Sequence, residues 1–249
     1  MYQANLLIRF FRICRIIIHT ITGLMIAAII FPLLQNNSKL SLTTWWCGGL
    51  LRAFGIKVKT FGNLPTDHIK GVLFVANHVS WADIHALNSC IRLRFIAKSD
   101  IKNWPIFGYL VTKANTLFID RSKRQEAGKI VATTCASLMS GDNLCFFPEG
   151  TTTDGAHILP FKSSVLQAAI DANSLIWPVA IRYVNNDGTI NQYMAYTGET
   201  SLVESMQAVL NVKKPVVELH FLTPIVTENK NRRELTLQAY NEIKATLNL

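Results

Sequence analysis

The chain has 249 residues, of which 49% are hydrophobic and 16% are charged, whereas about 25% of residues are charged in an average soluble domain. This composition excludes an intrinsically disordered chain, which would be rich in charge and poor in apolar residues. It also excludes a small disulfide scaffold and a collagen-like fibre. The length fits one globular domain with an appendage, or at most two small domains.

The net charge of +9 is concentrated at the start of the chain. Residues 1–66 contain seven lysines and arginines and no acid, since the first acidic residue is Asp67, and the other residues contain 18 cations against all 16 acids. A nucleic-acid-binding protein usually mixes its cations with polar and aromatic residues on a folded face. A basic, apolar segment instead favours contact with an anionic membrane surface.

The first predicted element is an apolar helix. Residues 16–34 carry no formal charge, and this length is close to the roughly 20 apolar residues that cross a bilayer. Arg9, Arg12 and Arg15 precede the run at spacings of three, which places them near one face of a helix. A cleaved signal peptide is an alternative, although no small-x-small cleavage site stands near the end of the run.

A second apolar stretch, residues 40–56, contains Trp45, Trp46 and a pair of glycines. Tryptophan favours the membrane–water interface. A single crossing would separate the two ends of the segment, whereas two half-buried helices keep them on one side of the membrane. We therefore expect residues 1–56 to form a membrane-associated helical hairpin or interfacial anchor. One buried helix of a soluble core is the alternative.

From residue 57 to residue 249, short apolar runs alternate with helical patterns, which predicts an α/β fold with a largely parallel central sheet flanked by helices. The near-continuous apolar character of the runs indicates strands covered on both faces. The expected strands are residues 72–76, 94–97, 116–119, 144–147, 176–183 and 216–221. The expected helices are residues 82–91, 104–114, 123–139, 163–172 and 232–247, and the clearest turn is 185–188.

Five cysteines are scattered at positions 14, 47, 90, 135 and 145, without a CxxC pair. This pattern fits buried free thiols in a reduced, cytosol-facing domain. The paired Cys/His spacing of a zinc site is absent from the sequence. We expect the protein to use no metal and no resident cofactor.

Polar clusters follow three of the predicted strands at their carboxyl ends, where chemistry gathers in parallel α/β sheets. These clusters are residues 77–83, 120–121 and 148–153. In the first cluster, His78 can remove a proton from a hydroxyl, and Asp83 can fix the tautomer of the imidazole. On one straight helix the two side chains would lie ~140° apart, from about 100° per residue. The pair therefore meets only if His78 lies in the loop and Asp83 in the first helical turn.

Each cluster also has a plainer interpretation. Asp83 could cap a helix beside an ordinary loop histidine, and Ser80 lacks the Gly-x-Ser-x-Gly elbow that exposes a nucleophile. Arg121 can bind a phosphate bidentately. Lys123 and Arg124 could add positive charge beside it, or they could be the solvated start of a helix. Residues 148–153 can turn backbone N–H groups toward an anion, and Glu149 can hold a substrate hydroxyl or orient a basic residue. An ordinary strand-to-helix turn is the alternative for this loop.

Together these residues resemble the glycerolipid acyltransferase family, which includes the 1-acyl-glycerol-3-phosphate acyltransferases. The segment Asn77-His78-Val79-Ser80-Trp81-Ala82-Asp83 is similar to the catalytic His-x4-Asp block of the family. Residues 118–121 and 147–151 are similar to the second and third blocks, and residues 177–180 to the fourth, which is linked to the acyl donor. Residues 97–98 and 104–108 are similar to another stretch of the family. The resemblance spans about residues 70–182.

The resemblance implies transfer of an acyl group from acyl-CoA or acyl-carrier protein to a lysolipid hydroxyl, first of all that of 1-acyl-glycerol-3-phosphate. It implies that His78 is the general base and Asp83 its partner. It also implies acceptor contacts by Arg121, by Glu149 with Gly150 and Thr151, and by the block residues Asn77 and Ser80. Backbone N–H groups or Lys98 are candidates for stabilising the oxyanion. We expect attachment to the bacterial inner membrane, with the catalytic domain facing the cytoplasm.

Two departures from the family keep other acceptors open. Phosphatidate-forming members usually carry an arginine soon after Glu-Gly-Thr, where this chain has Thr152 and Thr153. They also usually have a glycine shortly after a later Phe-Lys, where this chain continues with Ser163 and Ser164. A lyso-ornithine lipid is therefore a second candidate acceptor. A lipid hydrolase or thioesterase that uses His78 and Ser80, and a non-catalytic membrane adaptor, are alternatives of different classes.

Overall fold

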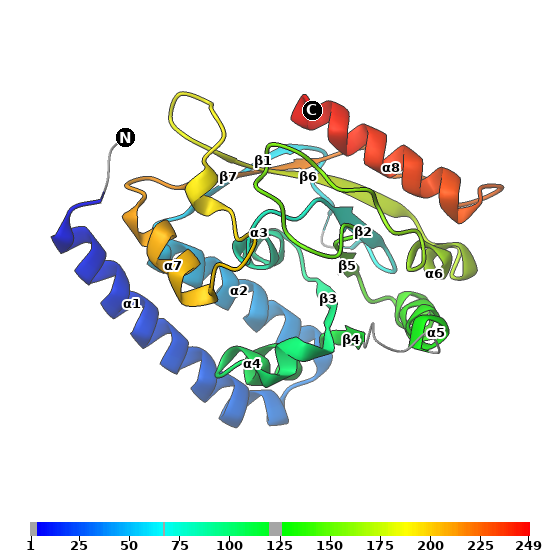
Figure 1. Ribbon diagram of the computed structural model, residues 1–249. Coiled ribbons are helices and arrows are strands. Elements are labelled where there is room, and N and C mark those ends of the chain that lie inside the picture. The colour runs from blue at the N-terminus through cyan, green and yellow to red at the C-terminus, as the bar shows by residue number, and fades with distance from the viewer. Residues whose placement is uncertain (1–3, 67, 120–125) are drawn as a thin grey trace.

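The computed structural model describes residues 4–66, 68–119 and 126–249 (Figure 1). Within these residues, seven strands form one sheet in the order β1-β7-β6-β2-β5-β3-β4. The strands are β1 (Lys57–Gly62), β2 (Leu73–Ala76), β3 (Arg94–Lys98), β4 (Leu117–Ile119), β5 (Leu144–Phe146), β6 (Ile176–Val184) and β7 (Val216–Phe221). Neighbouring strands are parallel, except that β6 and β7 are antiparallel. The prediction of a largely parallel sheet is confirmed.

Helices cover both faces of the sheet (Figure 1). They are α1 (Leu6–Met25), α2 (Asn36–Phe54), α3 (Ala82–Cys90), α4 (Phe107–Lys113), α5 (Glu126–Met139), α6 (Leu166–Asp171), α7 (Leu202–Asn211) and α8 (Arg232–Leu247). Phe74 of β2 packs with α2, α3 and α7, whereas its neighbours Leu73 and Val75 pack with α5, α6 and α8. Because successive side chains of a strand point to opposite faces, each central strand serves two cores, and this explains its continuous apolar sequence.

The N-terminal segment forms a hairpin of two long helices. After α1 the helix continues through a π-helical turn at Ile26–Ile30 and a 3₁₀ turn at Phe31–Leu33, and α2 then runs back along it. His19 and Trp46 join the two helices: the Trp46 indole donates to the His19 carbonyl at 3.0 Å, and the rings stack. A Cβ at Gly23 would lie 2.3 Å from the Trp46 indole nitrogen, so this crossing requires glycine.

The two helices of the hairpin differ in burial. The last turns of α2 contribute Leu50, Leu51 and Phe54 to the core that packs on β2 and α3. Helix α1 instead leaves one apolar face exposed. The large exposed side chains on this helix and its extension are Leu6, Leu7, Phe10, Phe11, Ile13, Ile17, Ile18, Ile21, Met25, Ile29, Ile30 and Leu33. Residues 6–33 form a helical stretch long and apolar enough to cross a membrane.

The three arginines at the start of α1, which their spacing places near one face of the helix, differ in burial: Arg9 is half-buried, Arg12 is buried and Arg15 is exposed. Arg12 is buried, and its guanidinium donates to the carbonyls of Leu210 at 3.2 Å, Val212 at 2.7 Å and Lys213 at 2.8 Å. These carbonyls lie at and just beyond the end of α7, where helix carbonyls lack partners within the helix. Arg12 therefore joins the hairpin to the α/β layers, and the expectation of a membrane-facing charge is wrong for this residue.

Two elements were missed by the sequence patterns. Strand β1 lies at one edge of the sheet with exposed Lys57 and Lys59, so it lacks the continuous apolar run of a central strand. Helix α7 follows a capping box in which Ser201 and Glu204 bond to each other's backbone N–H groups. That Ser-x-x-Glu spacing is a sequence signal that identifies a helix start. The predicted turn at 185–188 is present, closed by the Gly188 N–H bonded to the Asn185 carbonyl at 3.0 Å.

Candidate functional site

Two of the three predicted polar clusters meet at one edge of the sheet. His78 follows β2, and Glu149 follows β5, which is the parallel neighbour of β2. Because parallel strands end at the same edge, their following loops lie side by side. The third cluster, including Asp120, Arg121 and the nearby Lys123 and Arg124, lies outside the described residues.

The central feature of the site is the contact between His78 and Asp83. His78 lies in the loop after β2, and Asp83 is the second residue of α3, so the turn between them brings their side chains together. The His78 Nδ1 lies 2.8 Å from Asp83 Oδ2. Asp83 is fully buried, whereas the His78 side chain remains 18% exposed. A buried carboxyl group thus holds one nitrogen of a ring that remains partly exposed.

Asp83 is held by backbone and side-chain donors. Its Oδ2 also accepts the N–H groups of Val79 at 2.7 Å and Ser80 at 2.9 Å, and its Oδ1 accepts the Tyr183 hydroxyl at 2.6 Å. Burial and the negative charge of Asp83 raise the pKa of Tyr183, so its hydroxyl remains a donor. These hydrogen-bond donors offset the cost of burying the Asp83 side chain. Tyr183 was missed because it lies 100 residues along the chain.

Glu149 connects the two loops rather than facing an open site. Its Oε1 accepts the His78 N–H at 2.7 Å, and its Oε2 accepts the Leu159 N–H at 2.8 Å. The residue is 3% exposed, and burial raises the pKa of its carboxyl despite these hydrogen bonds. Both carboxyl oxygens of Glu149 therefore accept hydrogen bonds from the protein itself. This geometry favours a positioning role for Glu149 over the expected contact with a substrate hydroxyl.

An aromatic pair covers one face of the candidate base. The Phe147 ring stacks on the His78 ring with centroids 3.9 Å apart, and Phe95 of β3 stacks on Phe147 at 6.1 Å. Phe95 also lines a narrow apolar cavity of about 100 Å³ between the N-terminal hairpin, α3, β3 and α4. Trp46, Ile84 and Leu110 line the same cavity. Phe95 thus lines the apolar cavity and also packs on Phe147, the ring that stacks on His78.

Asn77 and Ser80 are both buried in the protein interior. The Asn77 amide donates to the Ile181 carbonyl at 3.0 Å and accepts the Ile181 N–H at 2.7 Å, which extends the pairing of β2 with β6. The Ser80 hydroxyl is buried and accepts the Ala82 N–H at 3.4 Å at the start of α3. The structure therefore gives both residues a role in holding the loop, and it does not support Ser80 as a nucleophile.

The remaining predicted residues lie around the pair. Gly150 has a φ of +78°, which favours glycine, and Thr151 is exposed beside it. Lys98 is exposed at the carboxyl end of β3, the same edge of the sheet as His78. Thr153 was missed as a site residue, although its N–H donates to the His78 carbonyl at 2.8 Å. Among the described residues, no three His, Cys, Asp or Glu are arranged to hold a metal ion.

This arrangement is suited to proton transfer. Because Nδ1 faces a carboxylate, it carries the proton, and the lone pair of the neutral ring is then on Nε2. A positioned imidazole in this state can accept a proton from a hydroxyl that attacks an acyl carbon. The structure thus supplies a general base and its orienting partner.

Comparisons with known proteins agree with this chemistry. The model of a family described as acyltransferase matches residues 55–182. A protein of Neisseria meningitidis serogroup B, named 1-acyl-sn-glycerol-3-phosphate acyltransferase, is 34% identical over 200 residues, which cover 80% of this chain and 78% of the relative. A Pseudomonas aeruginosa protein named lyso-ornithine lipid O-acyltransferase is 34% identical over 206 residues, covering 83% and 78% of the two chains.

A solved structure of an acyltransferase shares the fold. The crystal structure of a 1-acyl-sn-glycerophosphate acyltransferase from Thermotoga maritima superposes with a TM-score of 0.58 and 20% sequence identity. The match covers 95% of this chain and 96% of the other. The N-terminal hairpin is therefore included in the region over which the two folds correspond.

Proposed function

The chain belongs to the acyltransferase family, and from this we propose that it moves a fatty acyl group from a thioester donor to the free hydroxyl of a lysolipid. The observation that carries the proposal is the 2.8 Å contact between His78 Nδ1 and the buried carboxylate of Asp83. The donor is acyl-CoA or acyl-carrier protein, and the product is a diacyl lipid. The reaction belongs to membrane lipid biosynthesis.

His78 is the catalytic base in this proposal. Its Nε2 takes the proton of the lysolipid hydroxyl as the oxygen attacks the thioester carbon. Asp83 stabilises the imidazolium that forms, and collapse of the tetrahedral intermediate expels the thiolate, which takes the proton back from Nε2. An ester bond forms and a thioester bond breaks, without a covalent acyl-enzyme. Lys98 or backbone N–H groups of the surrounding loops stabilise the oxyanion.

The apolar cavity beside Phe95 supports this assignment. Its lining is almost wholly hydrophobic, as expected for a site that accepts part of an acyl chain. Stacking of Phe95 and Phe147 connects the cavity to His78. A chain lying in the cavity would therefore bring its carbonyl carbon toward the base.

The acceptor is one of two lysolipids. Relatives named for 1-acyl-glycerol-3-phosphate and for lyso-ornithine lipid are equally similar to this chain, at 34% identity. Thr152 and Thr153 follow Glu-Gly-Thr, where phosphatidate-forming relatives usually have an arginine. The Thr152 hydroxyl donates to the Tyr196 carbonyl, and Thr153 holds the His78 carbonyl. We place 1-acyl-glycerol-3-phosphate first and lyso-ornithine lipid second, and we assign the acceptor phosphate to Arg121.

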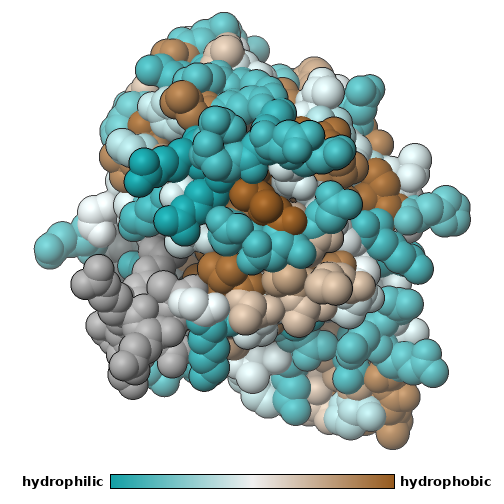
Figure 2. Space-filling model, turned by 90° about the vertical axis from the view of Figure 1, so that its right-hand side faces the viewer, coloured by the Kyte–Doolittle hydropathy of each residue, from teal (hydrophilic) through white to brown (hydrophobic). Residues whose placement is uncertain are grey.

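The exposed apolar face of α1 supports membrane attachment. Twelve large apolar side chains of this helix and its extension are at least 40% exposed, and a soluble protein rarely leaves so continuous an apolar face in water. The opposite face packs on α2 and α7, which favours a helix lying in the interface over one that crosses the bilayer. By contrast, the side of the molecule near α5, α6 and α8 is mostly hydrophilic (Figure 2). We propose attachment to the cytoplasmic face of a bacterial inner membrane.

A lysolipid panel tests the function. Membranes containing the protein receive labelled acyl-CoA or acyl-carrier protein and either 1-acyl-glycerol-3-phosphate or lyso-ornithine lipid. We expect labelled diacyl lipid from one acceptor, and Arg121→Ala should raise KM only for a phosphate-bearing acceptor. Labelled free fatty acid without any acceptor, abolished by Ser80→Ala, would instead identify a hydrolase.

A further inference from the structure

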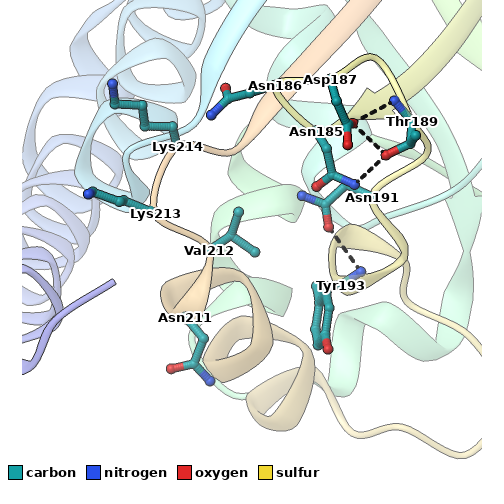
Figure 3. A pocket seen from close by; sticks show the side chains of 10 residues that line it. All are labelled: Asn185, Asn186, Asp187, Thr189, Asn191, Tyr193, Asn211, Val212, Lys213 and Lys214. Atoms are coloured by element: carbon teal, nitrogen blue, oxygen red, sulfur yellow. Dashed lines mark hydrogen bonds between the residues drawn. The ribbon is translucent and has the colours of Figure 1, made fainter. Parts of the chain in front are cut away.

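Two hollows of the molecule differ in how their polar side chains are paired. One, of about 730 Å³, lies between the loop after β6 and the turn before β7, and the side chains of Lys213 and Lys214 point away from it (Figure 3). Asp187 accepts both the N–H and the hydroxyl of Thr189, and the Asn185 amide donates to the same hydroxyl. These polar groups are therefore paired within the wall of the hollow. The apolar cavity between the hairpin and α3 differs, because polar nitrogen atoms in its wall lack such partners.

Two polar side chains of the apolar cavity come from one side of α3. His85 and Asn88 both line the cavity, and residues three positions apart are neighbours on a helix surface. Asn88 is 3% exposed, and its Oδ1 accepts the Leu93 N–H at 3.3 Å. Its amide nitrogen has no hydrogen-bond partner among the described residues. The Asn88 side chain therefore keeps N–H donors for a group that enters the cavity.

The His85 ring is also only partly satisfied. Its Nδ1 lies 3.5 Å from Cys47 Sγ, whereas its Nε2 has no hydrogen-bond partner in the described parts of the chain. The rings of Trp46 and Trp81 pack against it edge to face, with centroids 5.9 and 6.0 Å away. Burial lowers the pKa of His85 to about 4, so the ring is neutral near pH 7. Because the ring lies this deep, the accessible surface that it retains faces the cavity rather than bulk water.

The Cys47 thiol favours one tautomer of this ring. Burial raises the pKa of Cys47 to about 12, so the thiol is protonated, and its S–H can donate to His85 Nδ1. Nε2 then carries the ring hydrogen and is a donor. His85 and Asn88 together present N–H groups from adjacent turns of α3 to the same narrow space. A single oxygen atom, with two lone pairs, can accept hydrogen bonds from both.

We infer that His85 and Asn88 form a polar subsite that binds a hydroxyl group on the fatty acyl chain of the donor. The rest of the wall suits hydrocarbon, with side chains such as Ile84, Leu93 and Leu110. The cavity of about 100 Å³ has room for roughly three groups the size of a water molecule, at ~30 Å³ each, so a substituent inside it lies close to the wall.

The subsite distinguishes two kinds of chain. An unsubstituted chain covers the two donors without bonding to them, which leaves buried N–H groups unpaired. A hydroxyl at the same depth accepts their hydrogen bonds, so a hydroxyacyl donor binds better than a plain one of equal length. The inference rests on the proposed function, in which this cavity holds part of the acyl chain.

The test uses donors that differ by one hydroxyl. The ratio kcat/KM is measured for acyl-CoA of one chain length, either plain or with a hydroxyl at successive carbons. We expect wild type to prefer a hydroxyl at one position by about tenfold or more, because the plain chain leaves the donors unpaired. His85→Phe and Asn88→Leu should each remove this preference, whereas His85→Gln, which keeps an N–H donor, should retain part of it.

Thr43→Val is the matched control. Thr43 lines the same cavity, but its hydroxyl already donates to the Lys39 carbonyl at 2.8 Å, so its loss should leave the preference unchanged. The unfolding midpoint of each variant is measured beside wild type, so that a loss of fold is recognised.

Direct binding separates this inference from the proposed function. Calorimetry with the full chain in detergent compares the free fatty acids of the same series, and one hydroxy acid should bind about tenfold more tightly than the plain acid in wild type but not in His85→Phe. Acyl transfer without preference for any hydroxyl position, or a preference that His85→Phe retains, overturns the inference and leaves the acyltransferase proposal standing. If no lysolipid is acylated from any donor, the proposed function fails, and the binding of the free acids still decides the subsite.

Discussion

The His78 loop and helix α1 depart in opposite ways from the usual distribution of polar and apolar residues. In the loop, polar side chains are inside: Asp83 and Glu149 are buried, and each oxygen atom of both carboxylates accepts a hydrogen bond. On α1 and its extension to Leu33, apolar side chains are outside, and Leu6 and Leu33 are at least 80% exposed.

The two departures have different physical reasons. A buried carboxylate is costly unless donors surround it, and the donors that surround Asp83 also fix where His78 lies. An exposed apolar face is costly in water but not in a bilayer. The loop is therefore complete within the protein, whereas α1 leaves an apolar face exposed, which a membrane would cover in the proposed function. Substitutions in the two regions should have separate effects, on turnover in one case and on membrane binding in the other.

The largest effect is expected at His78. His78→Gln removes the base and should lower kcat by about 10²- to 10⁴-fold, the range that general-base catalysis contributes. The unfolding midpoint and the membrane-bound fraction should stay near those of wild type. His68→Gln, at an exposed position before β2, is the matched control. Acyl transfer by His78→Gln at the wild-type rate would falsify the mechanism.

The second-largest effect is expected on membrane binding by helix α1. Ile17→Glu/Ile21→Glu places charge on the exposed face of α1, where the two side chains are 54% and 55% exposed. Burying one isoleucine contributes about 1.5–3 kcal/mol, so the partition into vesicles, measured by flotation, should fall by about a hundredfold or more. Leu237→Glu on α8, where Leu237 is 59% exposed, should leave partition unchanged. Equal loss in both variants would mean that α1 has no special role.

A smaller effect is expected at Tyr183. Tyr183→Phe removes the hydroxyl that donates to Asp83 Oδ1 and leaves the ring in the core. Hydrogen bonds to charged groups contribute about 1.5–3 kcal/mol, so chemical denaturation should show a loss of this size and kcat should fall about tenfold. Tyr240→Phe on α8 serves as control. A variant with normal kcat and normal stability would show that Asp83 does not depend on this donor.

The smallest effect is a change in pH dependence at Glu149. Burial raises the pKa of this carboxyl above its ordinary value of 4.5, so the folded state holds the proton at a pH where the unfolded state has lost it. The stability that Glu149 contributes is complete below about pH 4.5 and decreases as pH rises through the raised pKa. The unfolding free energy of wild type relative to Glu149→Gln should therefore fall from pH 4 to pH 7. A difference that rises over this interval would contradict the burial argument.

Local apolar runs predicted the central strands. The His78–Asp83 contact was predicted from the resemblance of residues 77–83 to a family block, because the five-residue spacing alone was equally consistent with a helix cap beside a loop histidine. What escaped prediction depends on long-range contacts. Tyr183 reaches Asp83 across 100 residues, and Arg12 reaches the end of α7 across about 200. The antiparallel pairing of β6 with β7 likewise has no local pattern. Helix α7 is different, since its capping box was present in the sequence.

Arg12 has a practical consequence. Arg12 supplies donors to the carbonyls of Leu210, Val212 and Lys213, so the hairpin is part of the folded protein and not only a membrane tether. Deleting the hairpin would leave those carbonyls without their partner and would uncover the core that Leu50 and Phe54 close. A shortened chain should therefore aggregate rather than dissolve, and the intact protein in lipid or detergent is the form to purify.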